Sequence, residues 1–294
     1  MANGTLTTTA TNAQYKKYTY AYAGTSYPNI HVFTTISGQG VAPAIAPSVL
    51  NVRPLLENVN PQTIPASAVI AKTNACMHTY NNPNEFFGFF YQTPSSSSYP
   101  SMYVDGVSYN RTDFIPSGSY LYTDPKYYPS FCIKTDGTAT IRWFSSKASL
   151  DTALPYCKYI IGSCHPLVFN SKCVFNENVY DGESSGSRLL YNATNPDNQS
   201  NARMNINIDK MDNVYRTLLG HKSNGTFVMV STDSAISIKA AANLIQDLGC
   251  DYAVDMDGSS PVQMRIKANY GPAGQVTTKT AAKNVNTAVC AYVI

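Results

Sequence analysis

Two aspartates near the C-terminus have the spacing that acid–base or cation chemistry requires. Asp255 and Asp257 are separated by one apolar residue, and residues two apart in a strand project from the same face. Neighbouring carboxylates repel, which raises the pKa of one of them, so the pair offers an acid beside a base or a site for a divalent cation. Gly258 then permits a sharp turn, and Ser259 offers a hydroxyl and a backbone N–H to a ligand. The alternative is a solvated loop, because Asp-Gly-Ser is also common turn chemistry.

A strand, a helix and a second strand lead into this turn. Apolar residues that recur with the helical period indicate the helix: Ile238, Ala241, Ala242, Ile245 and Leu248. Ser234 or Ser237 is expected to cap its start, and Gly249 to end it in a left-handed conformation. β-like runs lie on either side, at 226–231 and 252–256. Such a unit is a crossover that pairs its two strands in parallel, and ligands favour the carboxyl ends of parallel strands.

The rest of the chain is dominated by short β-like runs separated by turn residues. Asp136-Gly137 and Ser223-Asn224-Gly225 are hairpin signals, because glycine adopts positive φ without steric cost. The sequence therefore predicts an α+β fold: a mixed, sheet-dominated single domain with a strand–helix–strand crossover near the C-terminus. The main domain is placed at 66–294. Residues 1–65 form either an N-terminal arm or attachment segment, or the first strands of the main domain.

Composition excludes several classes of protein. Of the 294 residues 13% are charged, and the net charge is +3 without clusters of Lys and Arg, so nucleic acid is not expected as a partner. No run of about eighteen apolar residues occurs, so no membrane span is expected. The polar, threonine-rich start of the chain lacks the features of a secretory signal peptide. Low charge combined with many Tyr, Thr and Asn residues is typical of extracellular or virion proteins, which is the expected location.

The seven cysteines form no C-x-x-C pair, which argues against a structural zinc site. Buried free thiols are favoured over a metal centre at Cys157, Cys164, His165 and Cys173, because an unpaired cysteine behaves as a small hydrophobe. We therefore expect neither a metal centre nor a cofactor, with a divalent cation near Asp255 and Asp257 as the alternative.

Several segments resemble, in their order and spacing, the phosphodiester glycosidase family. The run Arg216-Thr217-Leu218-Leu219-Gly220 resembles that family's Arg-Thr-x-x-Gly strand, and the helix ending at Leu248-Gly249 resembles its Leu-Gly helix end. Asp257-Gly258-Ser259-Ser260 resembles its glycine-rich Asp-Gly turn. Thr73-Asn74-Ala75 and the segment 162–172 fit earlier strand ends of the family in the same order. The resemblance extends from residue 68 to the C-terminus.

The resemblance implies a site assembled from distant parts of the chain. Asp257 would be the general base or nucleophile, since glycoside cleavage normally uses carboxylates. Arg216 would grip phosphate oxygens and stabilise charge on the leaving group. Asn74 would hydrogen-bond sugar or phosphate, with Asp255 and Ser259 as further substrate-binding residues. His221 would be an acid near neutral pH.

Three of these residues, and His165 as well, also have structural interpretations. Arg216 is alternatively an ion-pair partner within the fold, and Asn74 a turn residue. His221 is alternatively an exposed hairpin residue. His165, which precedes a proline, is interpreted as a packed loop residue rather than a catalytic one.

Departures from the family's pattern leave two functions open. Asp255 stands where the family usually has Asn, and Ser259-Ser260-Pro261-Val262 replaces most of the glycine-rich turn. The first hypothesis is a hydrolase that acts on a sugar-1-phosphodiester in a surface glycan or sugar-phosphate polymer; Arg216 and Asp257 favour it. The second is a non-catalytic structural or glycan-binding component of a bacteriophage tail, attached to other virion proteins through its N-terminal segment. The lost glycines favour the second.

Overall fold

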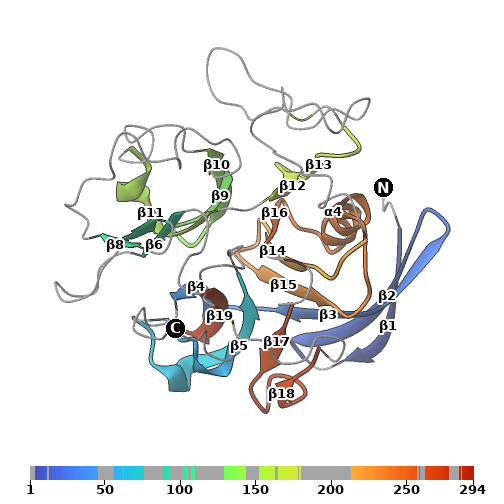
Figure 1. Ribbon diagram of the computed structural model, residues 1–294, viewed down its shortest axis with the longest axis horizontal. Coiled ribbons are helices and arrows are strands. Elements are labelled where there is room, and N and C mark those ends of the chain that lie inside the picture. The colour runs from blue at the N-terminus through green and yellow to red at the C-terminus, as the bar shows by residue number, and fades with distance from the viewer. Residues whose placement is uncertain are drawn as a thin grey trace.

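Three β-sheets and one helix make up the part of the chain that the computed structural model describes (Figure 1). This part comprises residues 4–11, 13–45, 56–61, 63–75, 89–92, 102–104, 107–109, 129–143, 152–162, 165–177, 179, 213–256, 258, 262–277, 285 and 287–294. Helix α4 (Ile238–Asp247) is the only α-helix that it contains in full, and three short 3-10 helices lie at Leu56–Asn58, Ala66–Ala68 and Leu154–Tyr156. The expectation of a sheet-dominated domain is confirmed, with less helix than a typical α+β fold. None of the described helices has the length and hydropathy that a membrane crossing demands.

The largest sheet has eight strands and carries most of the candidate site. Its spatial order is β1 (Thr5–Thr11), β2 (Tyr15–Tyr22), β3 (Thr25–Thr34), β15 (Phe227–Thr232), β14 (Thr217–His221), β16 (Tyr252–Asp255), β12 (His165–Phe169) and β13 (Lys172–Cys173). All neighbouring strands in it run antiparallel. Residues near both ends of the sequence therefore meet in one sheet.

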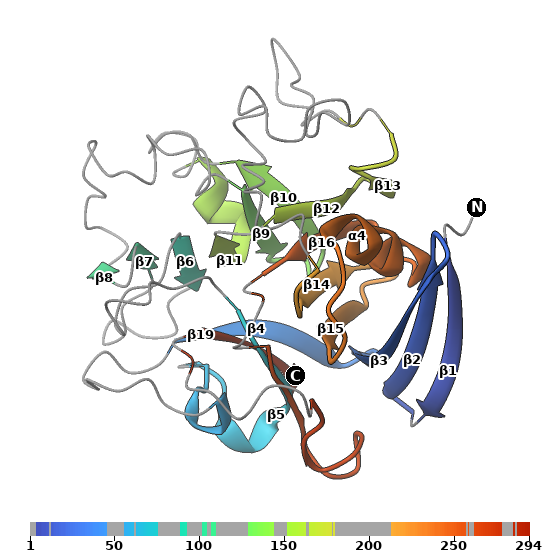
Figure 2. The same ribbon diagram turned by 45° about the vertical axis from the view of Figure 1, so that its right-hand side comes forward.

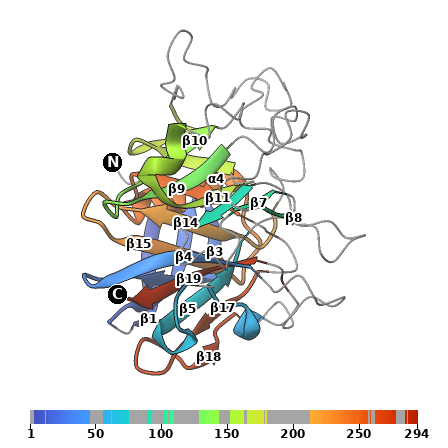
Figure 3. The ribbon, with the colours of Figure 1, turned by 90° about the vertical axis from the view of Figure 1, so that its left-hand side faces the viewer.

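Two smaller sheets complete the fold. The six-stranded sheet has the order β10 (Ala139–Trp143), β9 (Pro129–Lys134), β11 (Cys157–Gly162), β6 (Phe89–Gln92), β7 (Met102–Val104) and β8 (Val107–Tyr109). The five-stranded sheet has the order β18 (Gly274–Gln275), β17 (Met264–Ile266), β5 (Val69–Asn74), β19 (Thr287–Val293) and β4 (Gln39–Ile45). Figure 3, viewed from the side of the six-stranded sheet, shows β4, β19 and β5 lying alongside β14 and β15.

The strand–helix–strand unit exists, but one of its predicted properties is wrong. Strands β15 and β16 do run in the same direction, because both pair antiparallel with β14. They do not pair with each other, since β14 lies between them. The physical reason is the tight turn at Ser223-Asn224-Gly225, which folds β14 back onto β15 before the chain enters the helix. Gly225 has a φ of 85° there, as the hairpin prediction requires.

Helix α4 packs on the face of the large sheet formed by β12, β14 and β16 (Figure 2). Ser237 caps its start, because the Ser237 side chain accepts a hydrogen bond from the Ala240 N–H at 3.2 Å. Gly249, with a φ of 86°, ends it. Ile238 and Ile245 are fully buried, whereas Leu248 is half-buried. The periodicity in the sequence thus predicts both the helix and its buried face.

The N-terminal strands are built into the same sheets as the C-terminal part. Strand β3 pairs with β15, and β4 pairs with β19 along its whole length. The backbone N–H of Gly4 and the hydroxyl of Tyr20 both donate to the carboxylate of Asp247 at the end of α4, at 2.8 and 2.9 Å. The boundary at residue 65 therefore does not separate two sheets.

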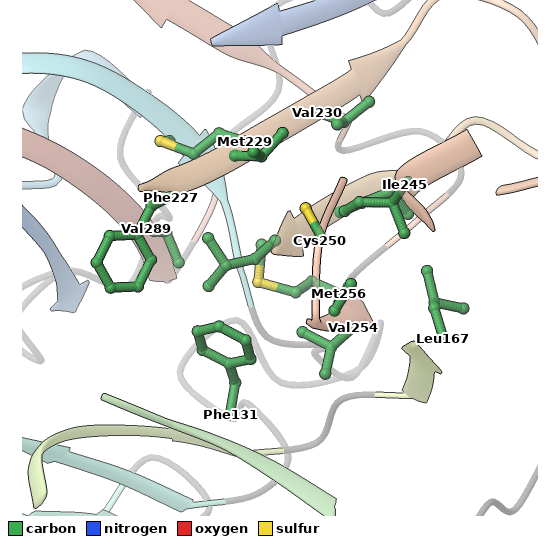
Figure 4. Packing of buried hydrophobic residues seen from close by; sticks show 14 of the residues in the cluster. Phe131, Leu167, Phe227, Met229, Val230, Ile245, Cys250, Val254, Met256 and Val289 are labelled. Carbon is green, nitrogen blue, oxygen red and sulfur yellow. The ribbon is translucent and has the colours of Figure 1, made fainter. Parts of the chain in front are cut away.

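One hydrophobic core joins all three sheets (Figure 4). It contains Phe131 from β9, Val254 from β16, Ile245 from α4 and Val289 from β19, all almost completely buried. Five of the seven cysteines lie in the described part, and all five are buried thiols: Cys132, Cys157, Cys173, Cys250 and Cys290. Burial of side chains from three sheets in one cluster is what a single domain requires.

Candidate active site

A fully buried ion pair lies at the end of the two central strands. The Nη1 atom of Arg216 donates to Oδ2 of Asp255 at 2.6 Å, and both side chains have 0% exposure. The Nε atom of Arg216 donates to the carbonyl of Ile236 at 2.8 Å, just before α4. The second oxygen of Asp255, Oδ1, is buried and has no hydrogen-bond partner among the described residues. The pair thus holds opposite charges in an environment shielded from bulk solvent.

Backbone pairing positions the two charged residues. Asp255 is the last residue of β16 and lies opposite Leu218 of β14. Arg216 immediately precedes β14, where its N–H donates to Oγ1 of Thr232 at 2.9 Å. The N–H of Met256 donates to the carbonyl of Thr217 at 2.8 Å, which continues the ladder past Asp255. The ion pair therefore connects the strand of the Arg-Thr segment to the strand that carries the aspartates.

His165 is packed, as expected, but it lies in a strand and not in a loop. It begins β12 and lies directly opposite Asp255 on the other side of β16. Directly opposed residues of antiparallel strands project from the same face, so His165, Asp255 and Leu218 form a row across three strands. The His165 side chain is 3% exposed. The proline that follows it suggested a loop, and no local pattern in the sequence reveals its neighbour 90 positions further along the chain.

Asn74 is held on the opposite face of the large sheet. Its Oδ1 accepts hydrogen bonds from Oγ1 of Thr217 at 2.7 Å and from the N–H of Gln263 at 3.1 Å. A backbone N–H can only donate, so the partner must be the amide oxygen, and the orientation of the amide is fixed. Thr217 follows Arg216 in the chain, so the structure brings Asn74 next to the Arg-Thr segment.

A second set of hydrogen bonds extends this polar layer between the sheets. Thr73 Oγ1 donates to the carbonyl of Gln263 at 2.8 Å and lies 3.0 Å from Oγ of Ser231. We call Asn74, Thr217, Gln263, Thr73 and Ser231 the inter-sheet network. All five residues are at most 1% exposed. Because its members are buried and hydrogen-bonded to one another, the network fixes the end of β5 relative to β14 and β15.

The structure does not bring His221 to the ion pair. Arg216 precedes β14 and His221 ends it, so five residues of extended chain separate them by about 17 Å. The His221 ring is 3% exposed and contacts the ring of Phe227 edge-on, with centroids 4.9 Å apart. Burial lowers the pKa of His221 below its usual value. An acid that acts at the aspartate turn must therefore come from elsewhere.

Two of the predicted site residues, Asp257 and Ser259, lie outside the described residues. Gly258 between them is described and buried. A Cβ at this position would lie 2.8 Å from the carbonyl oxygen of Tyr215. Since a backbone oxygen cannot move aside cheaply, the turn after Asp257 requires glycine for close approach to the segment that carries Arg216.

The geometry around Asp255 bears on the alternative of a bound cation. Asp255 already has a guanidinium at 2.6 Å, so its charge is balanced without a metal ion. Within the described part of the chain, no group of three or more His, Cys, Asp or Glu side chains is arranged to hold a metal.

Comparison with known proteins identifies the family. A model of the phosphodiester glycosidase family matches residues 90–292, which include Arg216, His165 and both aspartates but not Asn74. The fold is similar to that of the zebrafish N-acetylglucosamine-1-phosphodiester alpha-N-acetylglucosaminidase catalytic domain auto-inhibited by its pro-peptide, with a TM-score of 0.55 and 13% identity over 99% of this chain and 82% of that one. A hypothetical protein from Synechocystis has a TM-score of 0.56 and 11% identity over 99% of this chain and 64% of its own.

A search of curated protein sequences gave no match. At identities this low the two solved structures show the fold alone, whereas the family model covers well over half of the sequence, including the segments around the ion pair. This chain belongs to the phosphodiester glycosidase family.

Proposed function

We propose that the protein hydrolyses the bond between an anomeric carbon and a phosphodiester in a surface glycan or sugar-phosphate polymer. The observation that carries this proposal is the buried ion pair between Arg216 and Asp255, which is two positions before Asp257 in the sequence. Membership in a family of phosphodiester glycosidases supports the reaction class. The zebrafish enzyme of similar fold is named for an N-acetylglucosamine-1-phosphodiester, which makes that sugar a first choice of substrate.

The ion pair favours different roles for the two aspartates. Asp255 is bound to Arg216 and fully buried, so it is not available to take a proton from water. Asp257 is the remaining carboxylate, and we assign it the role of base or nucleophile. Glycosidases use carboxylates in both ways: the carboxylate either accepts a proton from the attacking water or forms a bond to the anomeric carbon that water then breaks. In both cases the carbon–oxygen bond to phosphate breaks, and the phosphate monoester leaves with the electron pair.

Arg216 was expected to grip the phosphate directly, but its side chain is completely buried in the fold. We therefore assign Arg216 to holding Asp255 and the start of β14 in place. Asn74 has its amide oxygen occupied by Thr217 and Gln263, so the amide N–H₂ is the part of this side chain that can donate to sugar or phosphate.

The test is release of free sugar from a panel of sugar-1-phosphodiesters, beginning with α-linked N-acetylglucosamine. Asp257→Asn keeps the shape of the side chain but removes its charge, and a loss of about 10²-fold or more is expected for a base or nucleophile. Glu177→Gln makes the same change from carboxylate to amide at an exposed residue of the described part, so it is the matched control and should retain full activity.

Two results would contradict the proposal. Turnover that Asp257→Asn leaves unchanged would place the chemistry at other residues. A wild-type protein that releases no sugar from any member of the panel, yet binds glycan as well as its Asp257→Asn variant does, would be a binding protein with the fold of the family.

A further inference from the structure

A polar groove lies at the opposite end of β14 from the ion pair. Three turns surround it: residues 35–38 after β3, 135–138 between β9 and β10, and 223–226 between β14 and β15. Figure 3 shows the three turns on the same side of the molecule. We call it the three-turn groove. Its volume is about 490 Å³, within the range of sites that hold a drug-sized molecule or a short oligosaccharide.

The floor and the rim of the groove differ in chemistry. Phe227, Val41 and Ile133 form an apolar floor, and each is at most 4% exposed. The rim is polar and carries hydroxyl and amide groups from all three turns, among them Ser37, Thr135, Ser223 and Asn224. An apolar floor below a rim of hydrogen-bonding groups matches a sugar chain, whose rings have apolar C–H faces and hydroxyl edges.

Two lysines give the groove its cationic character. The Nζ atom of Lys158 donates to the hydroxyl of Tyr292 at 3.2 Å and lies 5.4 and 5.9 Å from the ring centroids of Tyr159 and Tyr292. The aromatic rings thus hold this ammonium at the wall of the groove. Lys134, the last residue of β9, lines the groove beside the turn at 135–138.

The only carboxylate side chain in the groove lining already has hydrogen-bond donors of its own. Oδ1 of Asp136 accepts from the N–H and the Oγ1 of Thr138, at 2.8 and 2.6 Å. In the matching turn Asn224 does the same for the N–H of Thr226, at 3.0 Å. The acidic group is therefore hydrogen-bonded within its own turn, and the side chains that line the groove include two ammonium groups and one carboxylate.

From these features we propose that the three-turn groove is a second ligand site, separate from the ion pair, that binds an anionic oligosaccharide. The ring faces lie on the apolar floor, and a carboxylate or phosphate group of the sugar chain lies between Lys134 and Lys158. The proposal does not depend on turnover at the aspartates, because the length of β14 separates the two sites.

The experiment measures binding of three short oligosaccharides by NMR titration of the amides of Gly38, Gly137 and Gly225, one from each turn. The probes are an oligogalacturonate, a galactose oligomer that carries a phosphate group, and an uncharged galactose oligomer. The first two distinguish carboxylate from phosphate, and the third controls for charge. At least one anionic probe is expected to shift the three amides, with an affinity that falls as salt is added.

Variants of the two lysines assign the contacts. Lys158→Gln and Lys134→Gln should each raise the dissociation constant roughly tenfold, since each removes a hydrogen bond to a charged group. Lys158→Arg retains the charge and should retain most of the binding, which separates loss of charge from loss of fold. Lys16→Gln, at an exposed lysine of β2, is the matched control and should bind as the wild type does.

Three outcomes would overturn the proposal. The first is that none of the probes shifts the groove amides. The second is that the uncharged oligomer binds as tightly as the anionic ones, and the third is that the Gln variants bind the anionic probe as tightly as the wild type does. Equal binding of an oligo-glutamate peptide would also overturn it, because the site would then recognise charge and not a sugar chain. Each result can be obtained while the sugar phosphodiester assay succeeds or fails, so the two proposals stand or fall separately.

Discussion

The charged side chains near the two ends of β14 differ in their exposure to solvent. At its start, Arg216 and Asp255 are removed completely from bulk solvent and neutralise each other at 2.6 Å. At its end, His221 is buried against Phe227 while the lysines of the three-turn groove remain accessible around it. A buried pair has one geometry, because each ion depends on the other. Partly exposed lysines are screened by solvent and adapt to what approaches them.

This difference supports the proposals of chemistry at the start of β14 and of ligand capture at its end. Rate enhancement depends on polar groups that are fixed before the substrate arrives, and the ion pair with the inter-sheet network provides such groups. A groove with hydroxyl-bearing turns and partly exposed ammonium groups suits recognition of a flexible polymer. Arg216 and His221 are five residues apart in the sequence. Because the strand between them is extended, they lie at opposite ends of β14 and cannot share one site.

The largest expected effect comes from uncoupling the buried pair. Asp255→Asn preserves shape but leaves the guanidinium of Arg216 without a counter-charge, which should lower the free energy of unfolding by about 3–5 kcal/mol. Glu57→Gln is the matched control: it breaks the pair of Glu57 with Arg265, which has a similar length of 2.8 Å but side chains 43% and 29% exposed. That loss should be about 0–1 kcal/mol.

Urea denaturation of both variants measures the comparison. Equal losses would mean that burial does not distinguish the two pairs and that the start of β14 is no more rigid than the surface. A double replacement of Arg216 by Met and Asp255 by Leu should recover stability relative to Asp255→Asn, because no unpaired charge remains. The same double variant should lack sugar phosphodiester turnover if the pair positions the turn.

Glycines at the two ends should also respond differently to a methyl group. In Gly258→Ala the new Cβ would meet the backbone oxygen of Tyr215 at 2.8 Å, whereas in Gly40→Ala it would meet the hydroxyl tip of Tyr292 at 2.9 Å. Displacing backbone costs more than displacing a side-chain tip, so Gly258→Ala should lose about 1–3 kcal/mol and Gly40→Ala less. Thermal unfolding gives the order. A larger loss at Gly40 would contradict the view that the aspartate end is the less adaptable one.

A smaller effect is expected in the inter-sheet network. Thr217→Val keeps the shape of the side chain and removes the donor to Asn74, which should lower stability by about 0.5–1.5 kcal/mol. Because Asn74 would then lose the hydrogen bond from Thr217 that helps to orient its amide, the KM for a sugar phosphodiester should rise more than kcat falls. Thr19→Val, at a half-buried threonine of β2, controls for the substitution itself. If both variants have wild-type KM, Asn74 does not contact substrate through this orientation.

Local patterns and long-range contacts explain what the sequence could and could not predict. The period of Ile238 to Leu248 and the turn at Gly225 depend on neighbouring residues, so α4 and the β14–β15 hairpin were predictable. The helix cap was not: Ser234 and Ser237 are both suitable, and the Ser234 hydroxyl instead donates to the carbonyl of Pro28, more than 200 positions earlier. The position of β14 between β15 and β16 could not be predicted from local patterns either.

The candidate site depends almost entirely on such distant contacts. Asn74 meets Thr217 across 143 positions, and Arg216 meets Asp255 across 39. The family resemblance brought Asn74 and Arg216 together, since it preserves the order of distant strands. It did not predict that Arg216 would form a buried ion pair with Asp255, because the family usually has asparagine at the position of Asp255 and an amide carries no charge. The sequence shows that Asp255 replaces the family's asparagine, but it does not show which residue balances the charge of Asp255.

The smallest predicted effect concerns His221 and the pH dependence of stability. Burial lowers the pKa of His221 below its ordinary value of 6.5, so the folded protein holds this ring neutral where the unfolded chain binds a proton. Since the unfolded state binds more protons in that window, stability rises with pH and is lost as pH falls below 6.5. His221→Leu removes the titrating group, so its urea midpoint should fall less between pH 7 and pH 5 than that of the wild type. Identical pH profiles would mean that the His221 ring gains a proton in the folded state, and the end of β14 would then carry charge at both the histidine and the groove.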